Sequence, residues 1–187
     1  MGLRNFLIEG VSGTGKTAVC HELQRRGYDA VNGDRELAYQ GDPETGEANG
    51  RAGHEHHIWD VSQVRALVAD HREPVTFFCG GSRNFSKFID LFDGVFVLDV
   101  DLETLLARLD QRPADEWGAQ ASEREPIVRL HHTREDIPRT GVVIDAKPAA
   151  SRSSARADRG AGDCYAMPRR RRGSRTTGLL YAPPQPS

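Results

Sequence analysis

The chain has 187 residues, of which 37% are hydrophobic, and a formal net charge of −2. Its length and apolar content predict one globular domain of ordinary size and argue against a second. No apolar run reaches membrane-spanning length and the three cysteines form no C-x-x-C pair, so we expect a cytoplasmic protein without a membrane partner, zinc site or disulfide framework.

Short apolar segments alternate with helical patterns along residues 1–147. Strands are predicted at residues 5–8, 30–32, 75–79, 95–99 and 142–145, and helices at about residues 16–26, 58–71, 84–92, 101–111 and 123–136. This alternation predicts a three-layer α/β/α fold with about five parallel strands, whose carboxyl ends form the ligand-binding edge. Turn-forming residues 40–50 predict a long exposed loop, a common form of lid or substrate cover.

The most specific motif follows the first predicted strand. It has the form G-x-x-x-x-G-K-[ST] and opens a helix, which is the setting of a P-loop NTPase fold. Successive backbone N–H groups and the helix N-terminus can surround a triphosphate, the lysine can reach its β- and γ-phosphates, and the final threonine can hold Mg²⁺. The predicted nucleotide-binding residues are Gly10, Val11, Ser12, Gly13, Thr14, Gly15, Lys16 and Thr17, the last also as the metal ligand.

The C-terminal segment has a different composition. Residues 148–187 hold eight arginines and two aspartates, a balance of +6, so residues 1–147 carry −8 of the total of −2. With little apolar sequence, this tail is predicted to be disordered. Its four consecutive arginines, 169–172, could tether a nucleic acid, although we favour a solvated tail without function, and an altered reading frame is a further possibility.

With the loop, strand order and size in hand, residues 1–147 resemble the small P-loop kinases, which include shikimate kinase, gluconate kinase and the nucleoside monophosphate kinases. The resemblance implies that Asp34, after the second strand, orients the acceptor or acts as general base, with Arg35 beside it. It also implies that the segment after the third strand approaches the substrate, through Gly80, Gly81 and Arg83. A plain tight turn is an equal interpretation of the glycine pair.

The same resemblance implies a lid at about residues 112–123. Arg112, directly before a proline, would close on the triphosphate and neutralise charge on the transferring phosphoryl group. Arg108, one turn earlier, would support it or lie over the adenine, or it is simply exposed. Arg124 matches a substrate-binding arginine of some members, and residues 145–148 match a loop around adenine.

Two departures leave the acceptor open. The third strand, residues 75–79, ends without the acidic residue that many P-loop enzymes use near magnesium, and Gly80 to Arg83 replace the acceptor pattern of nucleotide kinases. Residues 54–57 gather three histidines, for which we favour an exposed polar segment over a metal site. His57 or Trp59 is a further candidate for the acceptor pocket.

These features predict a phosphotransferase that moves the γ-phosphoryl group of Mg·ATP to a small acceptor, such as a nucleoside, nucleotide, sugar acid or shikimate-like acid. Lys16, Asp34 and Arg112 are the predicted catalytic residues. The alternative is a non-catalytic or regulatory nucleotide-binding protein, associated with RNA through the arginine-rich tail. The absence of an Asn-Lys-x-Asp segment favours ATP over GTP, and the sequence leaves the oligomeric state open.

Overall fold

The computed structural model describes residues 4–114 and 117–147. The predicted tail, residues 148–187, and residues 115–116 of the predicted lid lie outside the described residues. Within the described ranges, no helix combines the length and apolar character that a membrane crossing requires.

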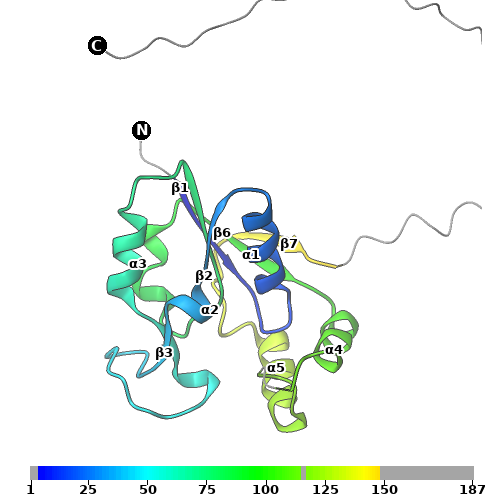
Figure 1. The fold of residues 1–187 in the computed structure, drawn as a ribbon. Helices are drawn as coiled ribbons and strands as arrows, with labels where there is room; N and C mark the ends of the chain where they lie inside the picture. Colours follow the sequence, from blue (N-terminus) through cyan, green and yellow to red (C-terminus); the bar gives the residue numbers. More distant parts are fainter. Residues whose placement is uncertain (1–3, 115–116, 148–187) are drawn as a thin grey trace, which may run out of the picture. The chain divides into compact units, whose positions relative to one another are not determined.

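The core is a five-stranded parallel sheet (Figure 1). Its order is β2 (Asp29–Asn32), β5 (Val75–Cys79), β1 (Arg4–Glu9), β6 (Gly94–Asp99) and β7 (Val142–Asp145). The central strand β1 pairs with β5 on one side and β6 on the other. The strands predicted from the apolar segments are confirmed, and the carboxyl ends of β2, β5 and β1 lie next to one another.

Helices cover both faces of the sheet. On one face Ile8 packs near Cys20 of α1 (Lys16–Arg25). On the other face Leu7 packs with Val64 of α3 (Val61–Val68), and Val97 packs against α4 (Leu102–Asp110) and α5 (Ala121–Thr133). Because successive side chains of a strand point to opposite faces, neighbouring residues of β1 enter different layers. The predicted three-layer α/β/α architecture is confirmed.

Two of the predicted helices differ in the structure. The first residues of the helix predicted at 58–71 form strand β4 (His57–Trp59), which pairs antiparallel with β3 (Ala38–Gln40). The carboxylate of Asp60 then accepts hydrogen bonds from the N–H groups of Ser62 and Gln63, which begins α3 after the strand rather than before it.

The helix predicted at 84–92 is instead two short 3₁₀ helices, η2 (Phe85–Lys87) and η3 (Ile89–Leu91). The buried Asn84 side chain accepts from the N–H of Trp59 at 3.0 Å and donates to its carbonyl at 3.0 Å. This long-range tie fixes the start of the segment on β4, and no local pattern in the sequence announces it. A one-turn helix α2 (Gly33–Glu36) and a 3₁₀ helix η1 (His54–His56) were also not predicted.

The predicted exposed loop at 40–50 is partly ordered by its own contacts. Gly41 and Ala48 form an isolated antiparallel bridge, and the Tyr39 hydroxyl donates to the Gly46 carbonyl at 2.6 Å. These contacts extend the β3–β4 hairpin beyond its paired strands.

Replacing Phe88 should test the packing under this hairpin. Phe88 is 1% exposed and stacks on Trp59, with ring centroids 5.5 Å apart. Phe88→Ala should lower the free energy of unfolding, measured by urea denaturation, by about 3–5 kcal/mol. Leu67→Ala, on a side chain that is 36% exposed, should cost about 1 kcal/mol or less. Equal losses in the two variants would contradict this description of the core.

Candidate functional site

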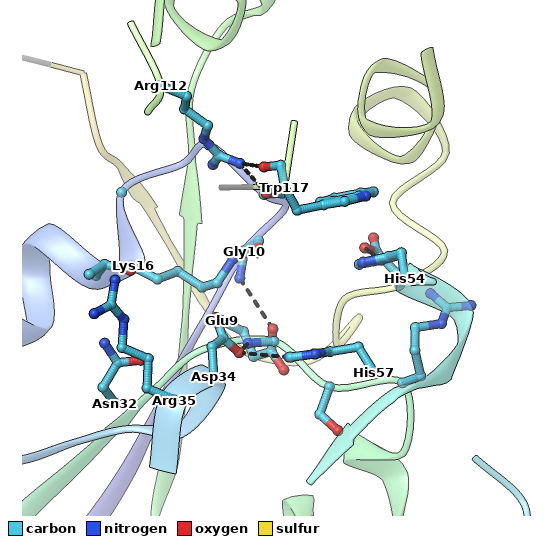
Figure 2. Close-up of a pocket in the computed structure, with 18 of the residues that line it drawn as sticks. Glu9, Gly10, Lys16, Asn32, Asp34, Arg35, His54, His57, Arg112 and Trp117 are labelled. Atoms are coloured by element: carbon cyan, nitrogen blue, oxygen red, sulfur yellow. Dashed lines mark hydrogen bonds and ion pairs between the residues drawn. The ribbon is translucent and has the colours of Figure 1, made fainter. Parts of the chain in front are cut away.

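A cavity of about 590 Å³ opens at the carboxyl edge of the sheet (Figure 2). Most of the residues predicted for the site line it together, namely Gly10, Ser12, Gly13, Gly15, Lys16, Thr17, Asp34, Arg35, Gly81, Arg83, Arg108 and Arg112. The predicted residues that are not part of its lining are Val11, Thr14, Gly80 and Arg124. Strands far apart in sequence therefore bring the phosphate loop and the predicted acceptor residues to one cavity.

The phosphate loop joins β1 to α1 in a conformation that only small residues allow. Gly13 has φ +96°, and a Cβ atom there would lie 2.5 Å from Cδ1 of Leu105 on α4. The Lys16 ammonium donates to the Gly10 carbonyl at 2.5 Å and to the Val11 carbonyl at 3.3 Å. A tight glycine loop with its lysine folded along it, at a helix N-terminus, has the chemistry that a triphosphate requires.

Two arginines, Arg108 on α4 and Arg112 in the segment after it, donate hydrogen bonds to the phosphate loop. The Arg108 guanidinium donates to the Thr14 carbonyl at 2.7 Å and to the Ala146 carbonyl at 2.7 Å, so it links the phosphate loop to the segment after β7. Arg112 donates to the Ser12 hydroxyl at 3.0 Å and to the Trp117 carbonyl (Figure 2). Both side chains therefore reach the loop along which a bound triphosphate would lie.

Asp34 lies in α2, directly after β2, and its side chain points into the cavity (Figure 2). Its Oδ1 accepts from the N–H of Gly81 at 2.9 Å and lies 3.2 Å from Nε2 of His57. A Cβ atom at Gly80, where φ is +156°, would lie 2.6 Å from Oδ1, so glycine is what lets the end of β5 approach this carboxylate. The glycine pair thus positions an acidic side chain.

The ionisation of Asp34 follows from these neighbours. Burial alone would raise the pKa of Asp34, but the hydrogen bond from His57, the charge of Lys16 and the Gly81 N–H together hold that pKa below its usual value. Asp34 is consequently an ionised carboxylate at neutral pH.

Glu9 is a second carboxylate of the cavity, and sequence reasoning missed it. It is the last residue of β1, only 1% exposed, and its Oε2 lies 3.4 Å from the N–H of Gly10. Burial raises the pKa of Glu9 well above its usual value; the charge of Lys16 opposes this shift and that of Asp34 adds to it. The available signal was an acidic residue directly after the apolar residues 6–8 and directly before the loop.

Two histidines, His54 and His57, also line the cavity. Nε2 of His54 lies 3.1 Å from Oδ2 of the buried Asp136, and the His54 ring stacks on Trp117 with centroids 4.7 Å apart. His57 and Trp117 also line the cavity, whereas Trp59 is 0% exposed in the core. In residues 4–114 and 117–147, no group of three or more His, Cys, Asp or Glu side chains could hold a metal ion.

The remaining predicted residues have distinct positions. Arg35 is an exposed residue of α2 at the cavity edge, and Arg83 lines the cavity while its backbone N–H donates to the His57 carbonyl at 2.9 Å. Arg124 lies on α5, where its guanidinium donates to Asp110 of α4 at 2.5 Å. The structure therefore brings Arg83 and Arg35 to the cavity and directs Arg124 to an interhelical ion pair.

A comparison with protein-family models matches the part of the chain that contains the phosphate loop. A family model described as "AAA domain" matches residues 7–129, well over half of the chain. A search of the curated proteins found no match.

Several solved structures resemble the chain. A sugar kinase from Janibacter sp. HTCC2649 is 20% identical, with a TM-score of 0.47 over 78% of this chain and 87% of its own. The protein TT1252 from Thermus thermophilus is 16% identical, with a TM-score of 0.46 over 81% and 91%. A gluconokinase from Sinorhizobium meliloti 1021 is 18% identical, with a TM-score of 0.45 over 78% and 84%. Likeness at this level identifies no acceptor.

The contact between His57 and Asp34 predicts a measurable pKa change. Because His57 helps to hold the pKa of Asp34 down, His57→Phe should raise that pKa toward the usual aspartate value. Carboxyl ¹³C NMR titration of the purified protein would follow it. His132→Phe, on an exposed histidine of α5, should leave the Asp34 titration in place. An identical Asp34 titration in wild type and His57→Phe would show that the contact has no electrostatic role.

Proposed function

The chain belongs to the AAA domain family, a family of P-loop kinases, and from this premise we propose that it transfers the γ-phosphoryl group of Mg·ATP to a small-molecule acceptor. The observation that carries the proposal is one cavity that holds both the phosphate loop and the ionised carboxylate of Asp34. A donor phosphate and an acceptor group could meet there, which is the main requirement of phosphoryl transfer.

The nucleotide half of the proposed site is the loop, Lys16, Arg108 and Arg112. Lys16 and the loop N–H groups would stabilise charge on the β- and γ-phosphates, and Arg112, held at Ser12, would add a planar cation beside the transferring group. Thr17, an exposed first-turn residue at the cavity, is the proposed Mg²⁺ ligand. Mg²⁺ would supply neutralisation of phosphate charge there.

The acceptor half of the proposed site lies around Asp34. Its carboxylate, fixed by Gly81 and His57, would accept a hydrogen bond from an acceptor hydroxyl and orient it. Arg35 and Arg83 lie at the same cavity and would suit an acceptor that bears a carboxylate or phosphate group.

We also propose a cytoplasmic location, which suits the free buried thiols of Cys20 and Cys79.

A regulatory nucleotide-binding protein remains the second candidate, on the strength of the arginines at 169–172. Such a protein would bind ATP without phosphorylating a small acceptor, and its binding to RNA would depend steeply on salt. Truncation after Lys147 separates the two candidates: a tether would be lost, whereas transfer to a small acceptor would persist.

Substitutions at Lys16 and at Asp34 should together separate nucleotide binding from transfer. With an acceptor found by screening nucleosides, nucleotides, sugar acids and shikimate-like acids for ADP release, Lys16→Ala should lower kcat by about 100-fold or more and weaken ATP binding. Asp34→Asn should lower transfer while ATP affinity, measured by calorimetry, stays within about twofold. Lys87→Ala, at a lysine outside the cavity lining, is the matched control for charge removal. Wild-type activity in Lys16→Ala or Asp34→Asn would refute the role given to that residue.

A further inference from the structure

Two carboxylates of the cavity, Glu9 and Asp34, have different surroundings, and we infer that they take different parts in activating the acceptor. We propose that Glu9 accepts the proton of the acceptor hydroxyl while Asp34 orients that hydroxyl. This inference rests on the proposed phosphotransferase function and adds to it a proton-accepting residue at the end of β1.

Glu9 is placed where the donor and acceptor halves of the site meet. It directly precedes Gly10 of the phosphate loop, and a Cβ atom at Gly81, beside Asp34, would lie 3.3 Å from its Oε2. Figure 2 shows the Glu9 carboxylate between the Lys16 and His57 side chains. A hydroxyl that contacts Asp34 would therefore lie close to Glu9, on the side that faces the loop.

One oxygen of Glu9 lacks a hydrogen-bond partner among the described residues. The residue is 1% exposed, and its Oε1 has no hydrogen-bond partner in the part of the chain that the structure describes. Burying an unpartnered carboxylate oxygen is costly, so such an atom in a ligand cavity is usually completed by the ligand. Oε1 itself is shielded in this conformation, so an acceptor hydroxyl would supply the missing donor once the Glu9 carboxylate turns toward the cavity that it lines.

Asp34 is less suited to taking a proton. Its Oδ1 already accepts from Gly81 and contacts His57, and both contacts favour the ionised form. A carboxylate held in this way is a good hydrogen-bond acceptor and a weak base. Two carboxylates whose surroundings favour opposite protonation states commonly take different roles in acid–base chemistry.

The charges around Glu9 come from three other segments. Burial has the largest effect and raises the pKa of Glu9. Among the nearby charges, Lys16 of α1 favours the ionised form of Glu9, whereas Asp34 of α2 and Asp136, between α5 and β7, favour its protonated form. The hydrogen bond from the N–H of Gly10 also favours the carboxylate. Glu9 thus has the raised basicity that a proton acceptor requires, and it is the ionised form of Glu9 that accepts the proton.

The proposed step moves one proton and one phosphoryl group. The acceptor O–H bond breaks and its proton moves to Oε1 of Glu9, while the acceptor oxygen forms a bond to the γ-phosphorus. The bond between that phosphorus and the oxygen bridging to the β-phosphate breaks, and its electron pair leaves with ADP. Glu9 then releases the proton to solvent as the products depart.

Glu9→Gln tests the proposal because it preserves size and removes the basic oxygen. We expect kcat to fall by about 100-fold or more, with the Kd for Mg·ATP within about twofold of wild type. The wild-type profile of kcat/KM against pH should show an acid limb, and this limb should be absent from the residual activity of Glu9→Gln. Glu9→Asp, which keeps a carboxylate, should recover part of the rate.

Asp136→Asn is the matched control, because Asp136 is a second buried carboxylate of the cavity with an unpartnered oxygen among the described residues. Whatever its rate, this variant should keep the acid limb. An acid limb that persists in Glu9→Gln and disappears in Asp34→Asn would overturn the proposal in favour of Asp34 as the base. A Glu9→Gln variant restored to the wild-type rate by raised Mg²⁺ would overturn it in favour of a metal-binding role.

A measurement without substrate provides an independent check. Because the pKa of Glu9 is raised in the folded chain, ionising it destabilises the fold as the pH rises above about 4.5, its value in the unfolded chain. Glu9→Gln should therefore melt at a higher temperature than wild type at pH 7 to 8, and this gain should shrink toward pH 4. A lower Tm at every pH would show that the carboxylate is merely structural.

These outcomes distinguish a failure of this inference from a failure of the proposed function. If wild type phosphorylates no acceptor, the proposed function is wrong. If wild type is active and Glu9→Gln retains both its rate and its acid limb, the function stands and the assignment of Glu9 is wrong.

Discussion

The hydrogen bond between the Gly81 N–H and Oδ1 of Asp34, at 2.9 Å, joins the segments that follow two neighbouring strands and fixes an acidic side chain at the cavity. Asp34 follows β2 and Gly81 follows β5, which pair in parallel register up to Asn32 and Cys79. Because β1 lies beside β5, the same edge also presents the phosphate loop. The position of the predicted acceptor group relative to the triphosphate loop is therefore a consequence of parallel strand pairing.

The sequence predicted best what is determined locally. The strand, glycine turn and helix around Lys16 form one continuous segment, and alternating apolar segments were sufficient for the five parallel strands. Prediction from the sequence failed where contacts between distant residues determine the structure. The bonds from Asn84 to Trp59 set the course of residues 82–92, and the contact between His54 and Asp136 joins residues 82 positions apart. No periodicity encodes either contact.

Glu9 was missed for a different reason. A single acidic residue at the end of an apolar strand ordinarily marks the point where the strand meets solvent, and only the structure shows that this one is buried beneath the phosphate loop. Its neighbour Asp34 has almost the same side chain, yet partners on Oδ1 favour its ionised form while burial favours the protonated form of Glu9. Surroundings, rather than residue type, separate the two carboxylates.

The proposed chemistry depends on the binding of a nucleoside triphosphate by the loop from Gly10 to Thr17. Isothermal titration calorimetry of the purified chain with Mg·ATP tests it most directly, with circular dichroism to confirm that the protein is folded. We expect saturable heat with a stoichiometry near one nucleotide per chain. A folded protein that gives no heat with either Mg·ATP or Mg·GTP would contradict it.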